Sequence, residues 1–107
     1  MAKWDDRQRP KPGPERDRAI VAALGSELVD GGAPPPYSTD EKAMNELVAT
    51  VERALELRLK AELIEGRVWT AAFLPIGHDG PFPRVPGRSR VDAVSAAALL
   101  ALLDAKS

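Results

Sequence analysis

The sequence predicts a mainly α-helical protein, and its composition gives two reasons. Alanine and leucine, which favour helices, are the commonest residue types, whereas aromatic residues make up 5% of the chain, too few for a typical β-sandwich or barrel. The 10 prolines and 8 glycines gather mostly at 10–14, 31–36 and 75–87 and leave three intervals nearly free of them. We predict three helices, at about 14–30, 38–65 and 89–105, with one extended segment at 67–76 and a proline-rich loop.

Composition and charge exclude several classes of site. The chain has no cysteine, which excludes disulfides, zinc ribbons, iron–sulfur clusters and thiol nucleophiles. His78 is the only histidine, so one chain cannot build a multi-histidine metal site. The net charge of −1 provides no strong overall field for nucleic acid or an anionic membrane. We therefore expect no cofactor and no metal.

Residues 1–13 are predicted to be a flexible N-terminal tail, and residues 14–107 a single small helical domain. The tail mixes charges of both signs with two prolines and one large apolar residue, Trp4, so it buries too little to order itself. Charged and polar residues interrupt every candidate apolar stretch, and export through a secretory signal is not expected.

The first predicted helix begins at Pro14, whose fixed φ suits a first helical position. Glu15 and Asp17 complement the positive end of the helix dipole, and Gly31 follows the last turn. Its apolar residues lie three and four positions apart and form one stripe: Ile20, Ala23, Leu24 and Leu28.

The second predicted helix has the clearest start signal, because Ser38 and Glu41 have the spacing of a capping box. An apolar face then continues to Gly66. A helix over 38–65 would be roughly 42 Å long, whereas a globule of this size has a diameter of roughly 34 Å. Such a helix either breaks near Leu57-Arg58 or extends beyond its own fold, where another chain would cover its apolar end.

The segment 67–76 combines aromatic and β-branched residues without a capping signal, which favours one strand. Ala71 and Ala72 suit a helix equally well, so the helical alternative stays open. A single strand has no neighbour within such a chain, so it would pair with its counterpart in a second subunit, add to the sheet of a partner, or be packed as an irregular segment. Residues 77–88 are predicted to be a loop interrupted by prolines.

The third predicted helix starts at Ser89 as N-cap, with Asp92 three residues later. The run 96–103 is apolar on every face. It is far too short for a bilayer, which needs about 20 residues, so no membrane span is expected and the run must be buried in protein.

This surplus of apolar helical surface predicts a non-enzymatic protein that acts by self-association or by docking on a larger protein. We expect a structural, adaptor or complex subunit, cytoplasmic or virion-associated, and the Ala- and Arg-rich composition is typical of a high-GC bacterium or its phage. Large aromatic side chains are the expected interface anchors, and the leucine-rich stripes are expected to form a shared core. Packing of Trp69 and Phe73 inside the monomer stays open as an alternative. The predicted interface residues are Trp4, Leu47, Val51, Leu55, Leu59, Trp69, Phe73, Phe82, Leu99 and Leu103.

Two other functions stay open. A DNA-associated regulator would use basic residues of the N-terminal and 84–90 segments. These are Arg7, Arg9, Lys11, Arg84, Arg88 and Arg90. A small enzyme or enzyme accessory would use His78, oriented by the carboxylate of Asp79. Neighbouring residues in a glycine-flanked loop rarely reach that geometry, and no catalytic residue is assigned.

Overall fold

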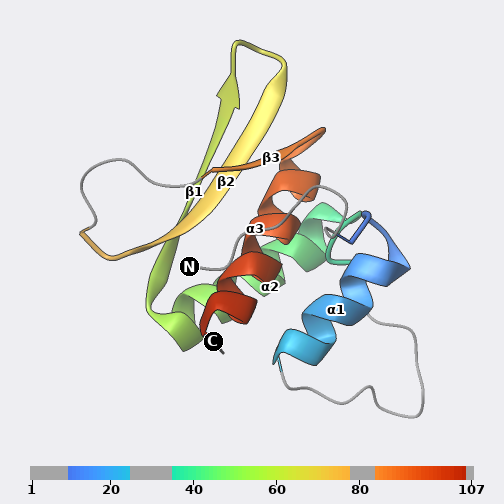
Figure 1. The fold of residues 1–107 in the computed structure, drawn as a ribbon, viewed down its shortest axis with the longest axis vertical. Coiled ribbons are helices and arrows are strands. Elements are labelled where there is room, and N and C mark those ends of the chain that lie inside the picture. Colours follow the sequence, from blue (N-terminus) through green and yellow to red (C-terminus); the bar gives the residue numbers. More distant parts are fainter. Residues whose placement is uncertain (1–9, 25–34, 78–83, 106–107) are drawn as a thin grey trace.

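A computed structural model of the protein describes residues 10–24, 35–77 and 84–105. The elements follow the order α1 (Pro14–Leu24), α2 (Glu41–Leu55), β1 (Leu57–Ile64), β2 (Val68–Pro75), β3 (Val85–Gly87) and α3 (Arg90–Ala105). The strands form one antiparallel sheet in the order β1-β2-β3. Figure 1 shows the sheet on one side of the molecule and the three helices on the other. The predicted mainly α-helical class is therefore wrong, and the fold is α+β.

The difference arises at the end of α2, which stops at Leu55 instead of continuing to 65. Glu56 adopts the left-handed conformation (φ 54°, ψ 43°), and its N–H donates to the carbonyl of Glu52, which ends the helix. Of the two alternatives for a long second helix, the chain takes the break. The apolar residues Leu57, Leu59 and Leu63 then follow the two-residue period of a strand face.

The start of α2 also differs from the prediction. Asp40, not Ser38, is the N-cap, and its carboxylate accepts a hydrogen bond from the N–H of Ala43 at 2.9 Å. The Ser38 side chain is buried and bonded to α1 instead, so it is not free to form the predicted pair with Glu41.

The β1–β2 hairpin pairs all eight residues of each strand, from Leu57 opposite Pro75 to Ile64 opposite Val68. Glu65 (φ 53°), Gly66 (φ 66°) and Arg67 connect the two strands, and the N–H of Arg67 donates to the carbonyl of Ile64 at 3.0 Å. Two successive left-handed residues are typical of the type I′ turn, which matches the twist of the strands.

The remaining elements agree in part with the prediction. The extended segment 67–76 is confirmed as β2, although it pairs with strands on both sides in the same chain. Residues 85–87, predicted to be loop, form β3. Ser89 caps α3 as predicted, since its Oγ accepts from the N–H of Asp92 at 3.1 Å. Helix α1 is described to Leu24, and the rest of the predicted helix to 30 lies outside the described residues.

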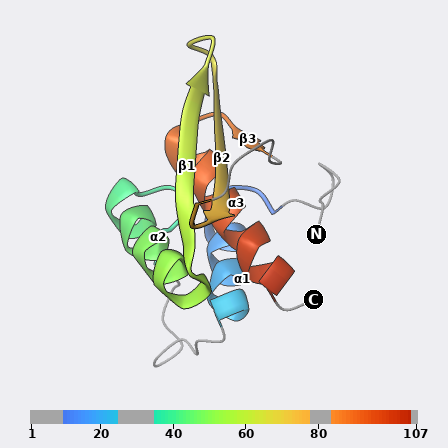
Figure 2. The same cartoon turned by 90° about the vertical axis from the view of Figure 1, so that its left-hand side faces the viewer.

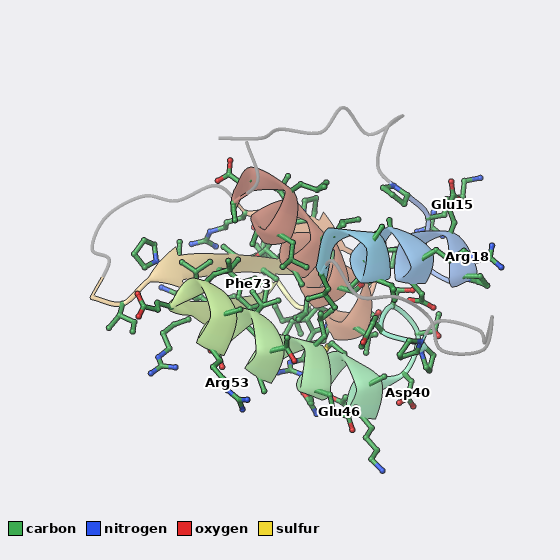
Figure 3. All side chains as sticks on the ribbon, turned by 90° about the horizontal axis from the view of Figure 1, so that it is seen from below. Glu15, Arg18, Asp40, Glu46, Arg53 and Phe73 are labelled. Atoms are coloured by element: carbon green, nitrogen blue, oxygen red, sulfur yellow. The ribbon has the colours of Figure 1, made fainter. Side chains whose placement is uncertain are left out.

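Helix α3 is the centre of the core, because it packs against α1, α2 and all three strands. Its small residues allow close approach, and its buried set runs from Ala93 to Leu99 with Leu102. Between α1, α2 and α3, Ile20, Val51 and Leu99 form one apolar cluster, and a second lies between α3 and the sheet. Figure 3 shows Phe73 between the sheet and the helices. None of the helices in the described ranges is long and apolar enough to cross a bilayer.

Candidate interaction surface

The β1–β2 hairpin extends beyond the helices, and Figure 2 shows its turn as the part of the described chain farthest from α1. Strand β1 is an edge strand, with β2 as its only strand neighbour among the described residues. The N–H of Leu59 points away from β2, since it donates to the Glu52 carboxylate at 3.0 Å. Backbone groups alternate in direction along an antiparallel strand. The N–H and C=O groups of Ala61 and Leu63 therefore also face the outer edge.

Apolar side chains lie exposed along the same hairpin. Leu63 is 46% exposed and Val68 43% exposed on either side of the turn, and Ile76, just after β2, is 64% exposed. These are three of the four large apolar residues classed as exposed in the described chain; the fourth is Leu103 of α3. Exposed apolar groups beside an unpaired strand edge are typical of a protein interaction site.

The face of β1 that points away from the helices carries charge. Arg58, Lys60 and Glu62 alternate with the apolar residues, as the two-residue period requires. Glu62 lies 3.5 Å from Lys60 and 3.0 Å from Arg84, so its carboxylate is shared between two exposed cations. The order of two cations followed by one anion along this face bears on which partner strand it fits.

Most of the interface residues predicted from the sequence contribute to the core of the single chain. Leu47, Val51 and Leu99 belong to the cluster between the helices, with Leu55 and Phe73 packed against it. Leu59 and Trp69 pack against the cluster between α3 and the sheet, whereas Leu103 is 37% exposed. Trp4 and Phe82 lie outside the described residues.

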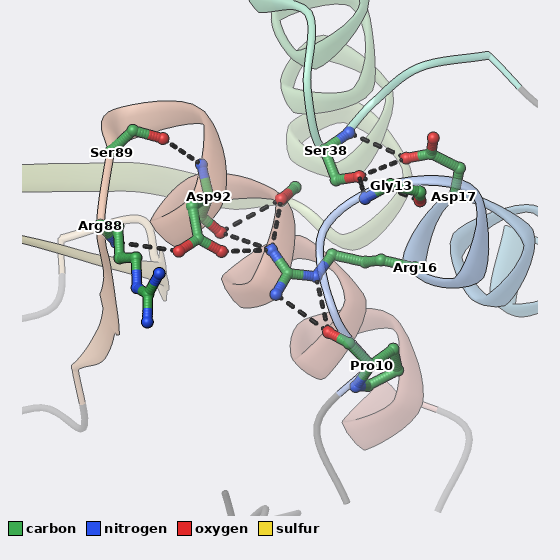
Figure 4. Close-up of polar contacts among 9 residues, drawn as sticks. Pro10, Gly13, Arg16, Asp17, Ser38, Arg88, Ser89 and Asp92 are labelled. Carbon is green, nitrogen blue, oxygen red and sulfur yellow. Dashed lines mark hydrogen bonds and ion pairs between the residues drawn. The ribbon is translucent and has the colours of Figure 1, made fainter.

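The polar latch, which joins the beginning of α1 to α3, consists of Pro10, Arg16, Asp92 and Ser95. Figure 4 shows Arg16 between Pro10 and Asp92. The Arg16 side chain is 1% exposed, and its Nη1 donates to the Asp92 carboxylate at 2.6 Å and to the Ser95 hydroxyl at 3.0 Å. Its Nε and Nη2 both donate to the carbonyl of Pro10, at 3.0 and 2.9 Å. The last residues of the predicted tail are thereby held against the helices.

A second buried polar group links α1 to the start of α2. Asp17 Oδ1 accepts from the N–H and the hydroxyl of Ser38 at 2.9 and 2.7 Å, and the N–H of Gly13 donates to Ser38 Oγ at 2.7 Å. Nearby, burial raises the pKa of Tyr37, and the carboxylates of Glu46 and Asp17 add to this increase.

The basic cleft has a volume of about 1020 Å³ and lies beside the polar latch. Segment 10–12, the hairpin turn and the end of β3 form its walls, and its charged lining residues are Lys11, Arg16, Arg67, Arg88 and Asp92. Both oxygens of the Asp92 carboxylate are occupied, one by Arg16 and the other by the backbone N–H of Arg88 at 2.8 Å. The lining of the basic cleft therefore contains more positively charged than negatively charged side chains.

The described residues of the predicted DNA-binding alternative are divided between the basic cleft and two ion pairs. Of the predicted DNA-contacting residues, Lys11 and Arg88 line the basic cleft. Arg84 and Arg90 form ion pairs instead, with Glu62 at 3.0 Å and Glu41 at 3.3 Å. Arg7 and Arg9 lie outside the described residues, as do His78 and Asp79, which the enzymatic alternative would use. Within the ranges that the structure describes, no cluster of three His, Asp or Glu side chains is arranged to hold a metal ion.

Comparison with known proteins found no matching family model, curated protein or solved structure. Two features of the described chain are available for a ligand or partner: the outer edge of β1 and the basic cleft. Sequence reasoning missed both. The alternation of Leu57, Leu59, Ala61 and Leu63 was a signal for the first, whereas the cleft joins segments far apart in the chain.

Proposed function

We propose that the protein is non-enzymatic and acts by self-association, in which the β1 edge of one copy pairs with the β1 edge of a second copy. The observation that carries the proposal is the outer edge of β1, which has no strand neighbour among the described residues. An unpaired edge presents backbone donors and acceptors that a further strand can bind. We place this assembly in the cytoplasm or in a virion, where it would serve as a structural or adaptor subunit.

The charge pattern of β1 favours a second copy as the partner strand. In an antiparallel pairing centred on Ala61, Lys60 of each copy lies opposite Glu62 of the other, and Leu59 lies opposite Leu63. Opposite charges and apolar pairs directly across two strands are stabilising, by roughly 0.2–1 kcal/mol each. Moving the centre by one residue in either direction would place Lys60 or Glu62 opposite itself, which is destabilising. The strand is therefore self-complementary in one register.

Glu52 limits how much of the edge is available. Its carboxylate already accepts the N–H of Leu59, so that donor is occupied in each copy. The pairing then rests on the N–H groups of Ala61 and Leu63, which donate to Ala61 and Leu59 of the other copy. Such a short ladder predicts a reversible dimer whose population depends on concentration, because each hydrogen bond contributes only about 0.5–1.5 kcal/mol net.

Sedimentation equilibrium over a concentration series tests the proposal. The wild-type mass should rise with concentration from 11.5 kDa towards twice that value. Ala61→Pro should remain monomeric, because proline removes an edge donor. The N–H of Ala61 points away from β2, so the hairpin ladder keeps its hydrogen bonds.

The matched control is Ala61→Thr, which retains the N–H and should associate like the wild type. Circular dichroism should give the same secondary structure for all three proteins. A wild type that stays at 11.5 kDa throughout the series would overturn the proposal. Equal association of a folded Ala61→Pro variant would also overturn it.

A further inference from the structure

The basic cleft is formed by parts of the chain that are distant in sequence and have no role in the β1 edge. None of its lining residues belongs to β1, so an inference from this cleft goes beyond self-association. The walls come from the N-terminal segment before α1, the turn between β1 and β2, and the junction of β3 with α3. A volume of about 1020 Å³ matches the larger ligand pockets of proteins.

Three cations in this cleft are available to a ligand. Lys11, Arg67 and Arg88 are each exposed, and the part of the chain that the structure describes provides no ion pair for their side chains. The fourth cation, Arg16, is buried and compensates Asp92. The lining thus carries four positive groups against one negative group, a net charge of +3, in a chain whose total is −1.

The residue types indicate what kind of anion fits. Guanidinium groups bind phosphate through pairs of parallel hydrogen bonds, and an ammonium group adds a further charge. A single small anion would leave much of the positive charge uncompensated, whereas a short chain of phosphoryl groups carries several negative charges. The other walls are Pro10, Pro12, Val68, Pro86 and Gly87, so the lining contains no aromatic side chain on which a base would stack.

We propose that the basic cleft binds a short polyphosphate, with Lys11, Arg67 and Arg88 contacting its phosphoryl oxygens. The phosphate chain can come from an inorganic polyphosphate or from the di- or triphosphate of a nucleotide, because both present the same oxygens. The binding involves no covalent step. Electrostatic attraction supplies most of the affinity, so salt should weaken it.

Isothermal titration calorimetry with inorganic triphosphate tests this assignment, in low salt and without added metal. The wild type should bind, and Lys11→Gln, Arg67→Gln and Arg88→Gln should each raise Kd about threefold to tenfold through loss of one charged contact. The matched control is Arg53→Gln, which removes an exposed charge from α2, away from the cleft, and should leave Kd unchanged. The Ala61→Pro variant should bind like the wild type, which separates this result from the outcome for self-association.

ATP distinguishes the two sources of the phosphate chain, and a short single-stranded DNA tests the ligand class. ATP should bind about as tightly as inorganic triphosphate, because the lining has no group that reads a base. ATP binding more than about tenfold tighter, a difference of about 1.4 kcal/mol, would overturn the assignment to the phosphate chain alone. No triphosphate binding, or an equal loss of affinity in Arg53→Gln, would overturn the site. Cleft-dependent binding of a short single-stranded DNA without triphosphate binding would overturn the ligand class.

Discussion

Replacement of Arg16 by methionine tests the polar latch, because methionine keeps an aliphatic side chain and removes only the guanidinium group. That group is 1% exposed and donates five hydrogen bonds, to Pro10, Asp92 and Ser95. Loss of one partner from a buried ion pair costs about 3–5 kcal/mol. Asp92 keeps the backbone N–H of Arg88 as a donor and is 13% exposed, so we expect the lower end, about 3 kcal/mol.

Urea unfolding followed by circular dichroism measures this loss as a change in the free energy of unfolding. The protein concentration must be constant, since association adds to apparent stability. The free energy of unfolding of a domain is roughly 5–15 kcal/mol. A loss of about 3 kcal/mol is a large part of it, so the urea concentration at the midpoint of unfolding should fall strongly. Arg18→Met is the control, because Arg18 is exposed on the same helix, and its effect should stay within about 0.5 kcal/mol. An Arg16→Met variant within about 1 kcal/mol of the wild type would refute the structural role that we assign to the latch.

Three other substitutions or titrations have expected outcomes. Glu56→Gly should raise the free energy of unfolding by about 1 kcal/mol, because Glu56 has φ 54° and glycine adopts this conformation without strain. A variant whose free energy of unfolding, measured by urea titration, is no higher than that of the wild type would contradict this. Gly87→Ala should lower the midpoint of thermal unfolding, because the added Cβ would lie 2.7 Å from the Cα of Ala93. Overpacking of this kind typically costs about 1–3 kcal/mol, and an unchanged midpoint would contradict the close contact between Gly87 and Ala93. The absorbance titration of Tyr37, the only tyrosine, should have a midpoint above about 10 in the native protein and near 10 in urea. Because the folded state holds this proton more tightly, the free energy of unfolding should fall as pH rises above about 10, and less so in Tyr37→Phe.

The elements that the sequence predicted correctly are those whose signals are local. Ser89 caps α3 through Asp92, three residues away, and Pro14 begins α1, so short-range chemistry decides both starts. The strand character of β2 comes from its own aromatic and β-branched residues. These signals require no knowledge of the rest of the fold.

Strand β1 was missed because its composition and its pairing point to different structures. Leucine, alanine, lysine and glutamate all favour helices, and they make up most of 57–64. The eight-residue ladder with β2 and the left-handed Glu56 override this preference. The alternation of apolar residues was visible, but the same leucines also extend the stripe of the preceding helix.

The polar latch and the basic cleft were not predictable from local patterns. Arg16 and Asp92 are 76 residues apart in the sequence, and only the packing of α1 against α3 brings them together. Two cations of the cleft, Lys11 and Arg88, were identified as basic residues, but their position beside Arg67 depends on the hairpin turn. Tertiary structure, not residue type alone, creates both features.

Amide hydrogen exchange measured by NMR at two protein concentrations tests the pairing of β1 edges most directly. The N–H groups of Ala61 and Leu63 face the outer edge, where water reaches them in a monomer. We expect both amides to exchange rapidly in dilute protein and at least about tenfold more slowly when the dimer predominates. The amide of Lys60, which faces β2, should remain protected in both samples. Exchange at Ala61 and Leu63 that is equally fast at both concentrations would contradict pairing through this edge.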